Sequence, residues 1–424
     1  MTAPVHEVLD AVWRAEAARI IAVVARLVRD VGVAEELAQD ALVAALEHWP
    51  RDGLPDNPAA WLMTTAKNRA LDRLRQAALH ARKQEELGAD LDALGAHVVP
   101  DIVDAIDAAR ADDIGDDLLR LIFTACHPVL GKDARVALAL RVLGGLSTAE
   151  IARAYLVPEP TVAQRLVRAK RTLAAAQVPF EVPRAEERAP RLASVLEVIY
   201  LIFNEGYAAS EGTDAMRPDL CAEALRVGRT LARLAPQESE AQGLLALMEI
   251  QASRTAARTG IDGRPVLLQD QDRSRWDAGH IERGLQALAR AQALCGHERM
   301  LGPYALQAAI AACHARAARA EDTDWARIVA LYDALAQAAP SPVVELNRAM
   351  AVSMAYGPAA ALELVDALGA EPALASYPWL PAARGDLLAR LGRHDEARVA
   401  FERAAALTHN AQERALLIAR AAGI

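Results

Sequence analysis

The chain has 424 residues, a formal net charge of −9 and only 4% aromatic residues, although 53% of its residues are hydrophobic. Strand-forming residues are sparse and helix formers are abundant, so the composition predicts an all-α protein of two to four domains. The charge argues against non-specific coating of nucleic acid, and no apolar run approaches the ~18 residues of a membrane span. Four separated cysteines and an N-terminus without a secretion signal predict free thiols in a cytoplasmic protein.

Three helices are predicted before residue 88. The first runs from Val8 to Val28, and the second runs from about Ala34 to His48. The loop between them contains Gly32, which we expect to end the first helix as a C-cap glycine. The second helix has its apolar residues on one side and three polar residues on the other, where they are available to a partner: Glu36, Gln39 and Asp40.

The third helix is predicted to be basic. A turn-rich loop over 49–56 leads to Asn57, which caps this helix, and to Pro58, which begins it. From Lys67 to Lys83 the helix holds six bases and a single acid, Asp72. A charged helix is usually a solvated surface, but charge of one sign destabilises a helix unless a polyanion meets it. The polar residues near its middle are Lys67, Asn68, Arg69 and Arg73, and Trp61 lies in its first turns.

An acidic segment follows the basic helix. From Gln84 to Asp117 there are eleven acids and one base, Arg110, which predicts a solvated linker. We expect acid pairs at its edge, such as Asp116-Asp117, to be solvated as well. Two helices, over 117–127 and 132–144, are then predicted to brace the motif that comes next.

The segment from Ser147 to Leu173 is predicted to be a helix-turn-helix. Ser147 and Glu150 have the spacing of a capping box, which starts a short helix over 148–154. Pro160 then suits the first turn of a second helix. That helix has an apolar face (Val162, Leu166, Ala169, Leu173) and a polar face (Gln164, Arg168, Arg171), flanked by Arg165 and Lys170. This layout is typical of a DNA reader, and an ordinary helical hairpin with a solvated face is the alternative.

The three motifs carry a resemblance to a known family. In chain order they are E-E-L-A-Q-D-A-L, N-P-A-A-W-L with K-N-R-A-L-D-R-L-R, and R-L-V-R-A-K-R. Over roughly Val8 to Ala176 the chain resembles a sigma-70 family RNA polymerase sigma factor, and it is similar to the extracytoplasmic-function (ECF) subgroup. The resemblance implies sigma region 2 over 1–88, an acidic linker over 89–112 and sigma region 4 over 113–176. It also implies two partners, core RNA polymerase and promoter DNA.

The resemblance assigns roles to particular residues. It implies polymerase binding by the second helix, through Glu36, Leu37, Gln39 and Asp40. It implies handling of the melted −10 strand by the loop Trp49–Asn57 and the third helix, through Trp61, Lys67, Asn68, Arg69 and Arg73. It implies −35 recognition by Thr161, Gln164, Arg165, Arg168 and Arg171. The sequence departs from the family at Leu156, where glycine is usual, and at Ala163, where a base is common. The acidic linker is either solvated or, by the same resemblance, a nucleic-acid mimic in a polymerase channel.

Beyond the sigma-like half, a hinge with three prolines is predicted over 177–190. A helix over 193–207 follows, and its end, Phe203–Tyr207, is either a binding spot or core. Weak repeats over 191–424 resemble tetratricopeptide (TPR) units, and the segment Thr259–Trp276 interrupts them. The copies are Ala224, Leu231 and Pro236; Ile328, Tyr332, Leu335 and Pro340; Ala361, Val365 and Leu368; and Gly385, Leu388, Gly392, Ala397, Phe401 and Ala404. The composite resembles ECF sigma factors with a TPR-containing C-terminal extension, which implies a protein or peptide partner for the extension.

No catalytic constellation appears in the sequence, so we predict neither an enzyme nor a cofactor. Cys126-His127 is too compact to form a metal site alone. The favoured hypothesis is a promoter-specificity subunit with a regulatory extension. One alternative is a helix-turn-helix regulator that binds duplex DNA alone, with a TPR-like sensor; another is a TPR adaptor protein. The basic third helix favours the first hypothesis, because a duplex-only regulator has no need of it.

Overall fold

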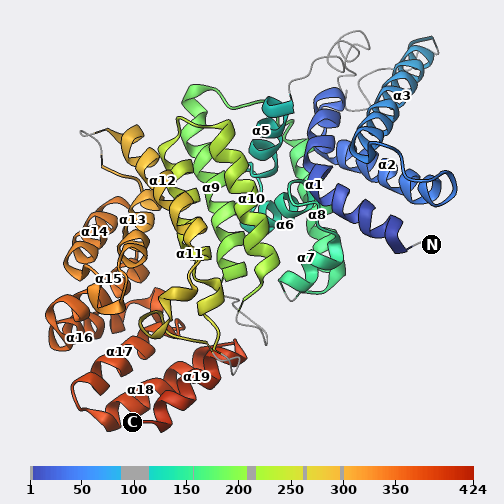
Figure 1. Cartoon of the computed structure of the whole chain (residues 1–424). Coiled ribbons are helices and arrows are strands. Elements are labelled where there is room, and N and C mark those ends of the chain that lie inside the picture. The colour runs from blue at the N-terminus through green and yellow to red at the C-terminus, as the bar shows by residue number, and fades with distance from the viewer. Residues whose placement is uncertain (1–2, 87–113, 156, 208–215, 261–264, 297–299) are drawn as a thin grey trace. The chain divides into compact units, whose positions relative to one another are not determined.

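The chain folds into helices, as the composition predicts. A computed structural model describes all residues except 1–2, 87–113, 156, 208–215, 261–264 and 297–299 (Figure 1). In the described ranges the only β-type pairing is an isolated bridge between Thr259 and Pro265. The chain divides into two compact units, Met1–Ile199 and Tyr200–Ile424. None of the described helices combines the length and apolar character that a membrane crossing requires.

Helix α1 (Ala3–Val28) forms the centre of the N-terminal unit. Helices α2 (Val31–Asp52), α3 (Pro58–Glu86) and α5 (Ile114–Ala125) all pack against it. From Ile20 to Ala25 every residue is at most 1% exposed, because helices surround this part of α1 on all sides. The three helices predicted before residue 88 are therefore confirmed, and the acidic linker predicted over 89–112 lies outside the described residues.

Two predicted helix boundaries are wrong. The turn between α1 and α2 is made by Arg29, whose φ is 54°, and by Asp30, whose carboxylate accepts a 2.9 Å hydrogen bond from the Val33 amide. Gly32 does not end α1; it lies in the first turn of α2, where a Cβ would come within 3.3 Å of the Lys170 side chain. Glycine at this position therefore serves close packing rather than helix termination.

The end of α2 also differs from the prediction. The helix continues past His48, through a proline, to Asp52, so the loop before α3 starts at Gly53 rather than at Trp49. A proline normally breaks a helix because it lacks the N–H donor. Here Trp49 is 2% exposed, and its ring packs edge-to-face on Trp61 at 5.6 Å. This buried contact holds the last turn of α2 in place.

Helices α6 (Lys132–Val142), α7 (Thr148–Ala154) and α8 (Glu159–Ala175) complete the predicted helix-turn-helix and one of its braces. The capping box is confirmed, since the Ser147 amide donates to Glu150 Oε2 at 2.8 Å and the Glu150 amide donates to Ser147 Oγ at 3.2 Å. The apolar face of α8 is confirmed as well, since Val162, Leu166, Ala169 and Leu173 are all buried. Leu156, in the turn, lies outside the described residues.

Asp117 contradicts the expectation of a solvated acid pair. It belongs to α5, its side chain is 0% exposed, and it forms ion pairs with Arg26 of α1 at 3.3 Å and with Arg120 at 2.7 Å. A buried carboxylate requires such partners. Asp117 therefore joins α1 to α5 instead of ending an exposed linker.

Helix α9 (Ala185–Tyr207) starts inside the segment predicted as a hinge, and Pro190 lies within the helix. Its first part belongs to the N-terminal unit. Arg191 Nη2 donates to the Phe123 carbonyl at 3.1 Å, and Ser194 Oγ donates to the Cys126 carbonyl at 2.6 Å. Glu197 forms ion pairs with Lys132 at 2.6 Å and Arg135 at 3.2 Å. The two hydrogen bonds satisfy carbonyl groups at the C-terminal end of α5, and all these contacts together fix α9 to α5 and α6.

The C-terminal unit is a succession of helices. They are α10 (Pro218–Leu234), α11 (Ser239–Ala252), α12 (Ala278–Cys295), α13 (Pro303–Arg316), α14 (Trp325–Ala338), α15 (Pro342–Tyr356), α16 (Pro358–Ala367), α17 (Trp379–Arg390), α18 (His394–Leu407) and α19 (Ala411–Ala422). Each helix from α13 to α19 packs on the next, and one buried cluster contains the repeat positions Ile328, Leu335, Val365, Leu388 and Phe401. Assignment of these helices to TPR units stays a prediction.

The four cysteines are free thiols, as expected. Burial raises the pKa of Cys126 to about 12, although the nearby Arg135 and Arg191 act against this shift. Burial likewise raises the pKa of Cys221 to about 12. Both groups therefore remain protonated and unreactive near neutral pH.

Candidate nucleic-acid interface

The polar face of α2 carries the residues predicted to bind a partner. Glu36 and Asp40 are exposed and Gln39 is half-buried. Leu37 is 6% exposed, so it packs beneath this face. The Asp40 carboxylate lies 3.7 Å from Arg69 on α3, with 57% of the Asp40 side chain and 41% of the Arg69 side chain exposed. This weak pair leaves Asp40 accessible.

Glu35, beside that face, is a functional candidate that the sequence analysis missed. Its side chain is 5% exposed, and its carboxylate accepts a 2.8 Å hydrogen bond from Arg141 Nε of α6 and a second hydrogen bond from Lys170 Nζ of α8. Lys170 is thereby held at α2 rather than on the open face of α8. A signal was present in the sequence, because Gly32 lies one turn before Glu35 and marks a close approach.

Two further ion pairs join the first helices to the later ones in the N-terminal unit. Arg14 of α1 lies 2.6 Å from Glu150, the capping residue of α7. Arg26 of α1 reaches the buried Asp117 of α5. The contacts of Arg14 and Glu35 thus tie the helix-turn-helix to α1 and α2, and the contact of Arg26 ties α5 to α1.

The basic face of α3 is partly exposed. Asn68 and Arg73 are exposed, while Lys67 and Arg69 are half-buried. Trp61 packs on Trp49 and, at 6.4 Å and an angle of 79°, on His48. Trp61 therefore supports the end of α2 as well as lying near the basic residues, which leaves Asn68 and Arg73 as the most accessible of the predicted −10 residues.

The outer face of α8 presents three of the five residues predicted to read DNA. Gln164, Arg168 and Arg171 are exposed at intervals of four and three residues, which puts them on one side of the helix. Thr161 is half-buried. Arg165 lies 3.2 Å from Asp133 of α6, with 34% of its side chain exposed. Arginine and glutamine can each make paired hydrogen bonds to base edges in the major groove, so this row has the chemistry of direct readout.

Among the described residues, no group of three or more histidine, cysteine or acidic side chains is placed to hold a metal ion.

Three parts of the chain match known protein families. Residues 12–79 match sigma-70 region 2, and residues 120–173 match sigma-70 region 4. Residues 191–292 match a family of unknown function (DUF6596). The third match begins at Arg191, the residue that ties α9 to α5.

Comparison with individual proteins gives relatives of two kinds. An uncharacterized protein of Rhizobium meliloti (strain 1021) is 47% identical over 393 residues, which cover 92% of this chain and 90% of that protein. The ECF RNA polymerase sigma factor SigK of Mycobacterium ulcerans (strain Agy99) is 31% identical over 159 residues, 37% of this chain and 78% of SigK. The probable ECF RNA polymerase sigma factor SigI of Mycobacterium tuberculosis (strain ATCC 25618 / H37Rv) is 26% identical over 235 residues, 54% of this chain and 77% of SigI.

Proposed function

Because the chain belongs to the ECF group of the sigma-70 family of RNA polymerase sigma factors, we propose that it binds core RNA polymerase and directs it to specific promoters. The observation that carries this proposal is the exposed row Gln164, Arg168 and Arg171 on the second helix of a helix-turn-helix. A row of this kind fits the major groove. The polymerase would supply the catalysis, and this chain would supply recognition.

Each exposed face has a role in the proposal. The α8 row reads the −35 element, and Asn68 and Arg73 of α3 contact the melted strand at the −10 element. Glu36, Gln39 and Asp40 of α2 contact core polymerase. Since both partners are found in the cytoplasm, we also propose that the chain works there.

Arg168→Ala should weaken promoter binding by the complex of this chain with core polymerase. If Arg168 contacts a base edge, the loss should be about 1–3 kcal/mol, with relaxed specificity at one −35 position. If it contacts only phosphate, binding to all sequences should weaken alike and the salt slope should fall by about one. Electrophoretic mobility shift at several salt concentrations separates these results. Arg233→Ala, which removes an exposed arginine of α10, is the control and should bind like the wild type.

Glu36→Lys tests the contact with core polymerase, and electrophoretic mobility shift can again measure how much of the complex forms. Glu36 is exposed, so the substitution should leave the fold intact while weakening association with core polymerase. Promoter binding by the wild-type chain without any polymerase would instead identify a duplex-only regulator. Wild-type affinity of the Glu36→Lys variant for core polymerase would contradict the assigned face.

We also propose that the extension controls the sigma-like half. A chain that ends after Ile199 lacks the C-terminal unit but keeps the contacts of Arg191, Ser194 and Glu197 with α5 and α6. We expect its transcription from a cognate promoter to differ from that of the full chain, because the controlling unit is missing. Lower output would indicate that the extension assists, and higher output would indicate that it restrains. Unchanged output, from a shortened chain that binds core polymerase normally, would refute regulation by the extension.

A further inference from the structure

The segment that interrupts the helical succession of the C-terminal unit brings two side chains together. It runs from the end of α11 to the start of α12 and contains the short turns η2 (Thr255–Ala257) and η4 (Arg273–Arg275). The Asp277 amide donates to the Ser253 carbonyl at 2.9 Å. The neighbours of these two residues, Arg254 and Trp276, thus lie close, with the Arg254 guanidinium carbon 5.8 Å from the Trp276 ring centre.

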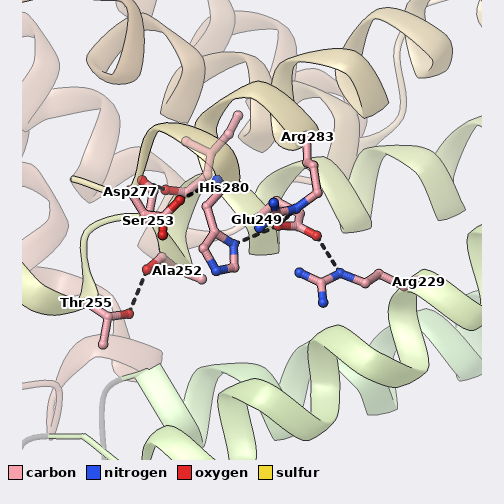
Figure 2. Close-up of polar contacts among 9 residues, drawn as sticks. Arg229, Glu249, Ala252, Ser253, Thr255, Asp277, His280 and Arg283 are labelled. Carbon is pink, nitrogen blue, oxygen red and sulfur yellow. Dashed lines mark hydrogen bonds and ion pairs between the residues drawn. The ribbon is translucent and has the colours of Figure 1, made fainter.

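A network centred on the buried Glu249 carboxylate links the end of α11 to the start of α12, the two helices that flank this segment. In Figure 2, His280 and Arg229 converge on the Glu249 carboxylate of α11, with bonds of 2.7 Å each, and Arg283 adds a third contact at 3.2 Å. Asp277 caps α12 by accepting from the His280 amide at 2.8 Å. Arg254 and Trp276 are therefore placed by ordered helix ends.

Three arginines of this segment gather on two aromatic rings. The Arg258 guanidinium carbon lies 3.8 Å from the ring centre of Tyr207, the last residue of α9, and that of Arg254 lies 5.7 Å from the same ring. The Arg273 guanidinium carbon lies 5.1 Å from the Trp276 ring centre. Arg273 also donates to the carbonyl of His314 at 2.7 Å. We call this set the arginine cluster: Tyr207, Arg254, Arg258, Arg273, Trp276 and His314.

No described acid pairs directly with Arg254 or Arg258 of the arginine cluster. Within the described ranges, Arg254 and Arg258 form no hydrogen bond or ion pair through their side chains. Glu321 and Asp322 act on Arg273 at longer range, and Glu413 acts on Arg258. Burial raises the pKa of Glu413, and its nearest partner is Thr408. An added anion would therefore supply Arg254 and Arg258 with the direct partner that these acids do not provide.

The arginine cluster also holds buried polar atoms that the described residues leave without a hydrogen bond. They are Nε of Arg254, Arg258 and Arg273, the hydroxyl of Tyr207, Nε1 of Trp276 and Nδ1 of His314. Tyr207, Trp276 and His314 are each only 7–8% exposed. Buried polar atoms are nearly always paired in proteins. Nearly all of these atoms are donors, so the partner that fits them is a group with several acceptor oxygens.

His314 supports the same conclusion. Burial, together with the charges of Arg254 and Arg273, lowers the pKa of His314 to about 4. Its ring is therefore neutral near pH 7 and adds no further positive charge, although it can still donate one hydrogen bond. An anion beside it would favour the protonated form.

We propose that the arginine cluster binds a small molecule through a phosphate or carboxylate group. Arg254 and Arg258 are partly exposed as residues although their Nε atoms are buried, so the arginine cluster is not sealed inside the protein. The planar donor forks of arginine match both kinds of oxyanion. The site lies in the part of the chain that matches a family of unknown function, and its existence does not depend on the sigma-factor role.

Isothermal titration calorimetry of the full chain tests the site, with inorganic phosphate and citrate as probes and chloride at equal ionic strength as reference. We expect saturable binding of at least one probe to the wild type. Arg254→Gln and Arg258→Gln should each weaken it about ten- to one-hundredfold, since each removes a charge-assisted contact. Arg275→Gln removes an exposed arginine from the same segment and should bind like the wild type. Binding of phosphate alone or citrate alone would identify the group that the site takes.

Two results would overturn the proposal. One is no saturable binding of either probe by the wild type. The other is equal binding by the wild type, Arg254→Gln, Arg258→Gln and Arg275→Gln, which would reduce the effect to general charge. Hydrogen exchange provides a second measurement that does not rely on the variants. A bound probe should slow amide exchange over 254–257 and 271–276 in the wild-type chain, and unchanged exchange at saturating probe would contradict binding at this place.

Discussion

Asp117→Ala should destabilise the N-terminal unit by about 3–5 kcal/mol, the range found when one partner of a buried ion pair is removed. The Asp117 side chain is fully buried, 3.3 Å from Arg26 and 2.7 Å from Arg120. Those two side chains are only 13% and 27% exposed. Without the carboxylate, two guanidinium groups would face each other's charge with little access to water, so the packing of α1 on α5 should loosen.

Asp72→Ala is a matched control for this prediction. Asp72 also pairs with an arginine three residues later, Arg75, at 3.0 Å, but its side chain is 66% exposed. Exposed pairs contribute little. Amide hydrogen exchange in the full chain follows each helix separately, and we expect faster exchange in α1 and α5 for Asp117→Ala but wild-type exchange in α3 for Asp72→Ala. Equal effects of the two substitutions would show that burial of Asp117 is unimportant.

Glu249→Gln should destabilise the C-terminal unit by about 3 kcal/mol. The Glu249 carboxylate is 1% exposed and accepts from Arg229, His280 and Arg283 (Figure 2). An amide in its place keeps the shape but loses the charge, and it presents an N–H₂ group to donors. We expect the lower end of the range for a buried pair, because the three partners are 24–49% exposed and water can hydrate them.

The pH dependence of this effect has a definite sign. Burial alone would raise the pKa of Glu249, but the hydrogen bonds and charges of Arg229, His280 and Arg283 outweigh it, and the pKa lies below its ordinary value. The stability contributed by the carboxylate is therefore present above its unfolded pKa of about 4.3 and is lost as pH falls through the folded pKa. The difference between wild type and Glu249→Gln should be constant near neutral pH and shrink in acid.

Hydrogen exchange in α11 and α12 at several pH values measures this difference. Glu396→Gln is the control, because Glu396 pairs with Arg393 at 2.7 Å at the surface, with 49% of its side chain exposed. We expect exchange in α18 to be unchanged by Glu396→Gln. A destabilisation by Glu249→Gln that persists undiminished in acid would mean that the charge of Glu249 is not its source.

The features that the sequence predicted well depend on neighbours in sequence. The capping box of Ser147 and Glu150 spans four residues, and the apolar face of α8 follows from a spacing of three and four residues. Both can be read from one stretch because both partners lie in it. The same holds for the start of α3 at Asn57, whose side chain accepts from the Ala60 amide at 3.0 Å.

The features that the sequence analysis missed depend on residues far apart in the chain. Glu35 and Glu36 are indistinguishable in a helix pattern, yet Glu35 is buried because Arg141 and Lys170 reach it from 106 and 135 residues away. In the sequence, Asp117 is one of several acids in and beside the linker, and its burial depends on its pairing with Arg26 of α1. The arginine cluster joins the end of α9, the segment after α11 and the end of α13, and no single stretch reveals it.

The contact between Glu35 and Lys170 limits the distance between the two helices that are proposed to read DNA. It brings α8, the proposed −35 reader, within hydrogen-bond distance of α2, beside the proposed −10 reader. On B-form DNA the two elements are ~25 base pairs apart, which is roughly 85 Å. Under the proposed roles, helices that touch cannot lie on both elements at once, so occupying both elements requires Lys170 to leave Glu35. We therefore expect the described arrangement to be that of the chain off its promoter.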